Sequence, residues 1–196
     1  MGSEMCIRDR YHRITGLRGK TLKNIIVQKF GGTSVGSTER IAHVAKIIEA
    51  ATKNSKVIVV VSAMSGETDR LIELSKSFST TPNKREFDAL ISTGEKVSAS
   101  LLAMALESEG ISAKSYSASQ VSLRTTSQFS KAKILDIDKQ RMQKILEEDN
   151  VPIITGFQGI TEGGDVTTLG RGGSDTTAVA IAAAVDAKRC LSLIHI

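Results

Sequence analysis

Two hydrophobic patterns alternate along the chain. Short apolar, largely β-branched runs at residues 25–27, 56–61 and 151–155 are typical of strands buried inside a parallel sheet. After the first run, apolar side chains recur at i, i+3, i+4 and i+7, as in an amphipathic helix, at Ile41, Val44, Ala45 and Ile48. Alternating strands and helices predict an α/β fold, a three-layer αβα sandwich with a mainly parallel sheet and helices on both faces.

The two ends of the chain do not follow this alternation. Residues 1–18 show neither a strand nor a helix period, and residues 191–196 follow the last helical pattern without a turn or a stop signal. We therefore expect a non-native or disordered leader at 1–22, a folded domain at 23–189 and a non-native tail at 190–196.

Composition favours a soluble globular protein that does not bind nucleic acid. Apolar residues make up 40% of the 196 residues and charged residues 24%, whereas aromatic residues are only 4% and tryptophan is absent. The net charge is +5, and residues 1–22, with five basic and two acidic side chains, supply +3 of it. The rest is scattered, so no basic surface is expected.

Metal-binding, disulfide and membrane signals are absent from the sequence pattern. Cys6 and Cys190 lie near opposite ends, and the three histidines form no ligand cluster, so neither a disulfide nor a protein metal site is expected. The apolar run 178–185 is too short to span a bilayer, and no secretory signal precedes the domain. We expect a cytoplasmic protein with no membrane partner.

The first strand ends in a glycine-rich turn, Lys29-Phe30-Gly31-Gly32, which is followed by a helix. Glycines let a ligand approach the backbone, and main-chain N–H groups at a helix start attract anions. Lys29 adds a positive charge suited to a phosphoryl group. The turn matches neither common nucleotide fingerprint, so a phosphate site and a purely structural turn are both open at this point.

A second glycine-rich loop lies at 165–178 and contains Gly170-Arg171-Gly172-Gly173. Arg171 can bind a carboxylate or a phosphate with two parallel hydrogen bonds. Asp175 is expected to face the same pocket as Lys29 and to hold cationic groups in place without acting as a nucleophile. Loops that leave parallel strands at their carboxyl ends converge on one site, so the two glycine-rich loops are predicted to meet.

Four motifs together resemble the aspartate kinases, within the amino-acid kinase superfamily. The motifs are Lys29-Phe-Gly-Gly-Thr-Ser-Val35, Ser92-Thr-Gly-Glu95, Gly156-Phe-Gln-Gly159 and Thr168-Leu-Gly-Arg-Gly-Gly-Ser-Asp175. They occur in the family's order and rough spacing, and the similarity covers about residues 24–188.

The resemblance implies a phosphotransferase that moves the γ-phosphoryl group of ATP to the side-chain carboxylate of L-aspartate, with Mg²⁺ carried by the nucleotide. The product, 4-phospho-L-aspartate, begins lysine, threonine and methionine biosynthesis. The implied ATP-phosphate site consists of Lys29, Phe30, Gly31 and Gly32. The implied aspartate site consists of Glu95 for the ammonium, Arg171 for the α-carboxylate, and Thr68 and Ser174 for polar contacts. Lys29 and Asp175 are the implied catalytic residues.

The resemblance also marks where the sequence departs from the family. Arg124-Thr125-Thr126 resembles a substrate-side loop, but Ser127 stands where an acidic residue is expected. The similarity stops before the family's nucleoside-binding half and its ACT regulatory domains, so the sequence predicts an incomplete domain from a longer, homo-oligomeric enzyme, without kinase turnover on its own. Alternatives are a superfamily member that phosphorylates glutamate, acetylglutamate, carbamate or UMP, and a non-catalytic ligand-binding fragment.

Overall fold

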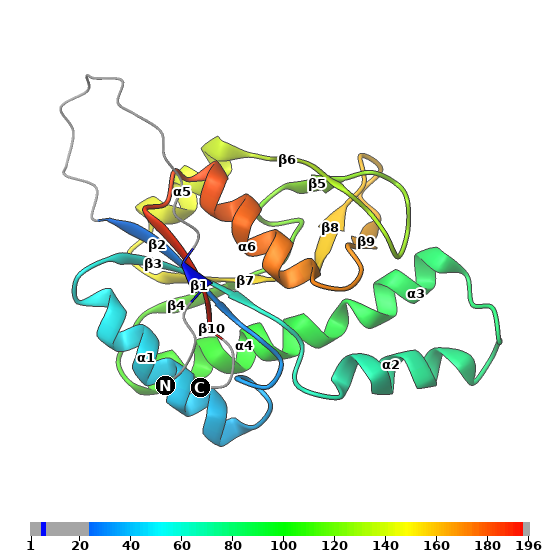
Figure 1. Cartoon of the computed structure of the whole chain (residues 1–196), viewed down its shortest axis with the longest axis horizontal. Coiled ribbons are helices and arrows are strands. Elements are labelled where there is room, and N and C mark those ends of the chain that lie inside the picture. Colours follow the sequence, from blue (N-terminus) through cyan, green and yellow to red (C-terminus); the bar gives the residue numbers. More distant parts are fainter. Residues whose placement is uncertain (1–4, 7–23, 194–196) are drawn as a thin grey trace.

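The computed structural model describes residues 5–6 and 24–193, and a six-stranded sheet forms its centre (Figure 1). The strand order is β1 (Met5–Cys6), β10 (Arg189–Leu193), β2 (Ile25–Phe30), β3 (Lys56–Val61), β7 (Val151–Thr155) and β4 (Ala113–Tyr116). Neighbouring strands are parallel throughout, except that β1 pairs antiparallel with β10. The predicted parallel sheet is therefore confirmed.

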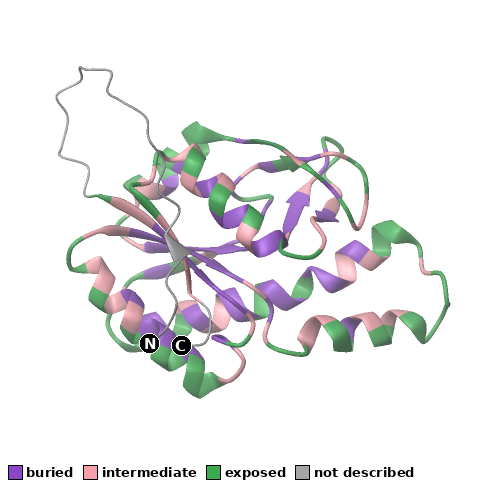
Figure 2. Ribbon diagram, viewed as in Figure 1, coloured by how far each residue is buried: buried purple, intermediate pink, exposed green. Residues whose placement is uncertain are grey.

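Helices cover both faces of this sheet (Figure 1). On one face, α1 (Thr38–Thr52) and α4 (Thr93–Ser108) pack on the sheet; α5 (Lys139–Glu147) and α6 (Gly173–Ala184) cover the other. Successive side chains of a strand point to opposite faces, so β3 serves both cores: Val59 faces the first pair of helices and Ile58 the second. Figure 2 shows the central strands buried between the two helical layers, which confirms the αβα sandwich.

A second, smaller sheet lies beside the carboxyl ends of the main strands. Its order is β6 (Ile134–Ile137), β5 (Leu123–Thr125), β8 (Gln158–Ile160) and β9 (Val166–Thr168). Next to it, α2 (Glu67–Lys76) and α3 (Lys84–Ile91) form a helical hairpin that reaches away from the sheet, on the right in Figure 1. These elements extend the fold on the side where the predicted ligand loops emerge.

Ser92 ends α3 and begins α4, so the two helices meet at this residue. Within the described part of the chain, the helical run Lys84–Ser108 is long and apolar enough to cross a membrane by length and composition. Half of its most apolar stretch is buried inside the fold.

The carboxyl-terminal boundary differs from the predicted one. Residues 190–193, assigned above to a tail outside the domain, form β10 and pair in parallel register with β2. Cys190 packs against the core under α6, and Leu193 packs against the core under α1, as the alternation of a strand requires. Of the predicted leader, only Met5 and Cys6 are described; its other residues lie outside the described part of the chain.

Candidate active site

A cavity of about 600 Å³ opens at the carboxyl ends of the main strands. Its walls come from the loops after β2 and β3, the helices α2 and α3, and the loop between β9 and α6. The predicted site residues that line it are Gly32, Thr68, Glu95, Arg171, Ser174 and Asp175. The expected convergence of the glycine-rich loops is therefore confirmed.

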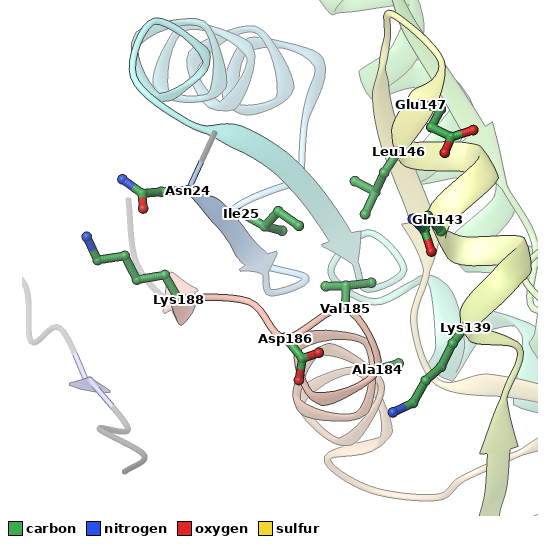
Figure 3. A pocket seen from close by; sticks show the side chains of 10 residues that line it. All are labelled: Asn24, Ile25, Lys139, Gln143, Leu146, Glu147, Ala184, Val185, Asp186 and Lys188. Atoms are coloured by element: carbon green, nitrogen blue, oxygen red, sulfur yellow. The ribbon is translucent and has the colours of Figure 1, made fainter. Parts of the chain in front are cut away.

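A second cavity, of about 500 Å³, lies between α5 and the end of α6, beside the first residues of β2 (Figure 3). Ile25, Leu146 and Val185 contribute apolar side chains to it, and Lys139 and Glu147 contribute charged ones. None of the predicted site residues lines this cavity. The two cavities are thus separate features of the fold.

The first glycine-rich turn is held by its own main chain. The N–H groups of Ser34 and Val35 donate to the carbonyl of Gly31, at 2.9 and 3.2 Å. A Cβ at Gly32 would lie 2.8 Å from the carbonyl oxygen of Ala63, so only glycine allows the turn after β2 to approach the loop after β3 so closely. The Oγ of Ser37 accepts from the N–H of Arg40 and caps α1.

Lys29 ends in an ion pair with Asp175 from the first turn of α6. Its Nζ lies 3.1 Å from a carboxylate oxygen of Asp175, and the Lys29 side chain is only 7% exposed, against 49% for Asp175. Asp175 also accepts a hydrogen bond from the Oγ of Ser192 on β10, at 2.9 Å. Gly31 lies beside this ammonium, since a Cβ there would be 3.6 Å from Nζ. A positive charge is therefore fixed beside the glycine-rich turn.

Phe30 takes a different position from its neighbours in the same motif. Its side chain is fully buried in the core between the sheet and the helices α1 and α4. Only its main chain can therefore serve the ligand side of the turn, and the phenyl ring anchors the end of β2.

Glu95 is buried, and only one of its two carboxyl oxygens has a hydrogen-bond partner among the described residues. It is 3% exposed, its Oε1 accepts a hydrogen bond from the N–H of Ala63 at 3.1 Å, and its Oε2 has no hydrogen-bond partner among the described residues. Burial raises the pKa of Glu95 to about 7, and main-chain hydrogen bonds offset this only in part. Gly94 permits this position, because a Cβ there would lie 2.8 Å from the Cβ of Ala63. A cationic ligand would satisfy the free oxygen.

Arg171 projects from the loop between β9 and α6 and is exposed. The glycines on either side, Gly170 and Gly172, adopt φ angles of +80° and +73°, which other residues rarely accept. The start of α6 behind this loop is set by Gly156, where a Cβ would lie 2.7 Å from Ser174. The glycines thus allow the loop to bring Arg171 to the cavity that Glu95 also lines.

Thr68 lies in the first turn of α2 and is half-buried in the cavity wall. Arg124, from the expected substrate-side loop, instead pairs with Asp136 at 2.8 Å on the exposed side of the small sheet and does not line the cavity. Its neighbour Thr125 is buried and shares a hydrogen bond with Thr167. That loop therefore supports the small sheet.

Asp88 is a buried residue beside the cavity that no pattern in the sequence predicts. It lies on α3, is fully buried, and accepts four hydrogen bonds from the segments at Ser130 and Thr168, both of which line the cavity. By residue type alone, an aspartate in a helix is most often exposed, and no spacing in the sequence connects it with those distant partners. The cavity thus offers a buried carboxyl group and an exposed guanidinium, and Asp175 in its wall holds the ammonium of Lys29, an arrangement that suits a zwitterionic ligand beside a phosphate group.

Comparison with known proteins agrees with this geometry. The model of the amino acid kinase family matches residues 24–195. The aspartokinase of Geobacillus stearothermophilus is 54% identical over 167 residues, which are 85% of this chain and 41% of that protein. The chain therefore spans less than half the length of this relative.

Solved structures show the same fold. The aspartate kinase from Synechocystis superposes with a TM-score of 0.75 at 44% identity, over 85% of this chain and 27% of that one. Aspartokinase III of E. coli, in complex with aspartate and ADP, gives a TM-score of 0.77 at 24% identity, over 88% of this chain and 49% of that one. At that identity the second likeness is one of fold.

Proposed function

Because the chain belongs to the amino acid kinase family, we propose that it forms the aspartate- and phosphate-binding part of an aspartate kinase. The proposed reaction transfers the γ-phosphoryl group of ATP to the side-chain carboxylate of L-aspartate and yields 4-phospho-L-aspartate and ADP. Support comes from the identity of 54% to the Geobacillus stearothermophilus aspartokinase and of 44% to the Synechocystis aspartate kinase.

One observation supports the choice of an amino acid as the substrate. The buried, unpartnered Oε2 of Glu95 and the guanidinium-bearing loop of Arg171 line the same cavity. An amino acid brings an ammonium for the first and an α-carboxylate for the second, and each pairing is a charge-assisted hydrogen bond. With both ends held, the side-chain carboxylate of aspartate remains free to react. Thr68 and Ser174 add polar contacts from the wall.

The chemical step needs no nucleophile from the protein. A side-chain carboxylate oxygen of aspartate attacks the γ-phosphorus; as this O–P bond forms, the bond from phosphorus to the β,γ-bridging oxygen breaks, and its electron pair leaves with ADP. The carboxylate is already ionised at neutral pH, so no base is required. What remains for the protein is positioning and charge stabilisation.

Lys29 supplies that stabilisation. Its ammonium, held by Asp175 beside Gly31, lies where a phosphate in the glycine-rich turn would meet it. Asp175 keeps this ammonium in place and is not consumed. Lys29, the main chain of Phe30, and Gly31 and Gly32 together make up the proposed ATP-phosphate site.

We infer that Mg²⁺ enters with the nucleotide. Across residues 24–193, no three His, Cys, Asp or Glu side chains gather in a way that could enclose a metal ion, and Mg²⁺ commonly binds substrate phosphates with few protein ligands. When bound, Mg²⁺ offsets negative charge on the phosphates. Lys29 and the glycine turn would hold those phosphates from the protein side.

The binding part of the proposal is tested on the purified chain by NMR titration with L-aspartate. We expect saturable shifts for amides around Glu95 and Arg171 and weaker binding of L-glutamate and D-aspartate, with a loss of affinity in the Glu95→Gln variant. Absence of binding, or preference for glutamate, acetylglutamate or UMP, would contradict the proposal and favour the other family members.

The catalytic part is tested in a chimera. The aligned 167 residues replace their counterparts in the Geobacillus stearothermophilus aspartokinase. Hydroxylamine then traps the acyl phosphate as a hydroxamate, and we expect ATP- and aspartate-dependent formation that the Lys29→Met variant lacks. A folded chimera without activity would argue that these residues form a binding module only.

A further inference from the structure

Helix α3 presents one polar face to the hairpin of β8 and β9. Arg85, Asp88 and Ser92 follow each other at i, i+3 and i+7 and therefore share a face of the helix. The Nε of Arg85 donates to Oδ1 of Asp165 at 2.7 Å, and the Nε2 of Gln158 donates to the carbonyl of Ser92 at 3.0 Å. Hydrogen bonds thus fasten both ends of this face to the small sheet.

Asp88 occupies the middle of the face and forms the strongest connection. Its Oδ2 accepts from the N–H of Ser130 and the N–H of Thr168, each at 2.8 Å. Its Oδ1 accepts from the Oγ of Ser130 at 3.0 Å and the Oγ1 of Thr168 at 3.1 Å. A carboxylate with no exposed surface is costly unless it is well bonded, and these four bonds satisfy it.

Both partners of Asp88 lie next to the loop that bears Arg171. Thr168 ends β9 two residues before Gly170. Ser130 adopts a left-handed φ of 66°, and its carbonyl oxygen would be 3.4 Å from a Cβ at Gly170. The bonds to Asp88 hold Ser130 itself in that conformation against the loop, beside a main-chain hydrogen bond from the N–H of Ala132 to the carbonyl of Thr168 at 2.9 Å.

The same helix leads directly to the other end of the site. Residue Ser92 joins α3 to α4, and Glu95 lies in the first turn of α4. The helix that holds the Arg171 loop through Asp88 therefore leads, through the single residue Ser92, into the turn that places Glu95. This short connection links the two charged ends of the cavity.

We propose that Asp88 is a positioning residue that sets where Arg171 lies relative to Glu95, and thereby the selection of a substrate with an α-carboxylate. This inference rests on the proposed function, in which Arg171 binds that α-carboxylate. Asp88 itself touches no substrate and acts through Ser130 and Thr168.

The test compares two ligands that differ only in the α-carboxylate. β-Alanine is L-aspartate without that group, so it can use Glu95 but not Arg171. In the Asp88→Asn variant, which keeps the shape but turns one acceptor into a donor, we expect the Kd for L-aspartate to rise about tenfold. The Kd for β-alanine should change less than about twofold, because no placement of Arg171 affects it. NMR titration of the full chain measures both constants.

A double-mutant cycle separates positioning from general damage. Arg171→Ala should weaken the binding of L-aspartate at least as much as Asp88→Asn does. The Kd of the double variant for L-aspartate should equal that of Arg171→Ala alone. Ile145→Ala, in the buried face of α5, is the control: it lowers stability yet leaves the ratio of the two Kd values unchanged. If Asp88→Asn does not fold, Thr168→Val removes one hydroxyl donor and is used in its place, with a smaller effect of the same kind.

The inference would be overturned if Asp88→Asn weakened the binding of L-aspartate and of β-alanine equally. It would also be overturned if the effects of Asp88→Asn and Arg171→Ala on L-aspartate binding were additive. If the unaltered chain bound neither ligand, the proposed function would fail. Amide hydrogen exchange would then test whether Asp88 positions the Arg171 loop. In that case we expect faster exchange at residues 169–173 in Asp88→Asn than in Ile145→Ala. Unchanged exchange there would overturn the positioning role as well.

Discussion

The ammonium of Lys29 lies 3.1 Å from the carboxylate of Asp175, although 146 positions separate the two residues in the chain. The contact joins the end of β2 to the first turn of α6, and it fixes a positive charge beside the first glycine-rich turn. The two partners differ in exposure, since Lys29 is 7% exposed and Asp175 49%. Because of this difference in exposure, we expect that removing the charge of Lys29 and removing that of Asp175 will lower the free energy of unfolding by different amounts.

Asp175→Asn should destabilise the fold more than Lys29→Met. The first variant leaves a buried ammonium without its counter-charge, whereas the second leaves a carboxylate that water can reach. We expect the free energy of unfolding to fall by about 1–2 kcal/mol for Asp175→Asn, since the exposure of Asp175 lets water screen part of the loss. Urea unfolding measures the difference.

A matched control for that comparison is Glu73→Gln, which breaks the exposed pair of Glu73 and Lys76. Its effect should stay below about 0.5 kcal/mol. If Lys29→Met lowered the free energy of unfolding more than Asp175→Asn did, the main contribution of the pair would not be the compensation of the buried Lys29 ammonium.

Glu95 predicts that stability depends on pH. Burial raises its pKa from the ordinary 4.5 to about 7. The folded state therefore binds a proton more tightly than the unfolded state does. Its contribution is fully present below about pH 4.5 and is lost as pH rises through about 7. We expect unfolding free energy to fall by up to about 3 kcal/mol across this window, and urea titrations at several pH values measure it.

In Glu95→Gln the group that titrates is gone, so the slope between those pH values should largely disappear. The same slope in the variant would mean that other groups cause the pH dependence. Asp88 and Asp175 remain unchanged in this comparison, which isolates the contribution of Glu95.

The same residue predicts how ligand affinity depends on pH. An ionised Glu95 attracts the ammonium of L-aspartate, and a protonated one does not. As pH rises through about 7, the affinity for L-aspartate should increase, so its Kd should fall, whereas the stability of the fold should decrease over the same range. NMR titrations below and above that pH measure it. Affinity that is independent of pH would place the ammonium elsewhere in the cavity.

Much of the fold could be predicted because its signals are local. The runs at β2, β3 and β7 are β-branched and apolar, and parallel strands buried on both faces require such runs. The meeting of Lys29 with Asp175 followed from the rule that loops at the carboxyl ends of parallel strands converge. Burial of Glu95 agreed with its place after Ser92-Thr93-Gly94, where glycine allows close packing.

The remainder depends on contacts that no short stretch specifies. The strands β8 and β9 have three residues each, too few for a period to be visible. They form because they pair with one another and because β8 also pairs with β5. Residues 190–193 lack a turn signal, yet they complete a parallel pair with β2. Asp88 has the residue type of an exposed helix position, and only the folded chain brings Ser130 and Thr168 to it.

Gly156 predicts a steric coupling between β7 and the start of α6. A Cβ at this position would lie 2.7 Å from both Cβ and Oγ of Ser174, closer than real contacts allow. Gly156→Ala should therefore push the first turn of α6, with Asp175, away from the sheet. We expect the free energy of unfolding to fall by about 1–3 kcal/mol and the affinity for L-aspartate to weaken.

Gly163→Ala provides the comparison, because a Cβ there meets nothing closer than Thr161 Oγ1 at 3.8 Å. It should change the unfolding free energy by less than about 0.5 kcal/mol and leave binding intact. Urea unfolding compares the stability of the two variants, and NMR titration compares their affinity for L-aspartate. If Gly156→Ala were as mild as Gly163→Ala, the approach of α6 to the end of β7 would not depend on glycine, and the position of Asp175 opposite Lys29 would need another cause. If instead only Gly156→Ala weakens binding, the close contact at Ser174 is what keeps the charged pair aligned with the glycine-rich turn.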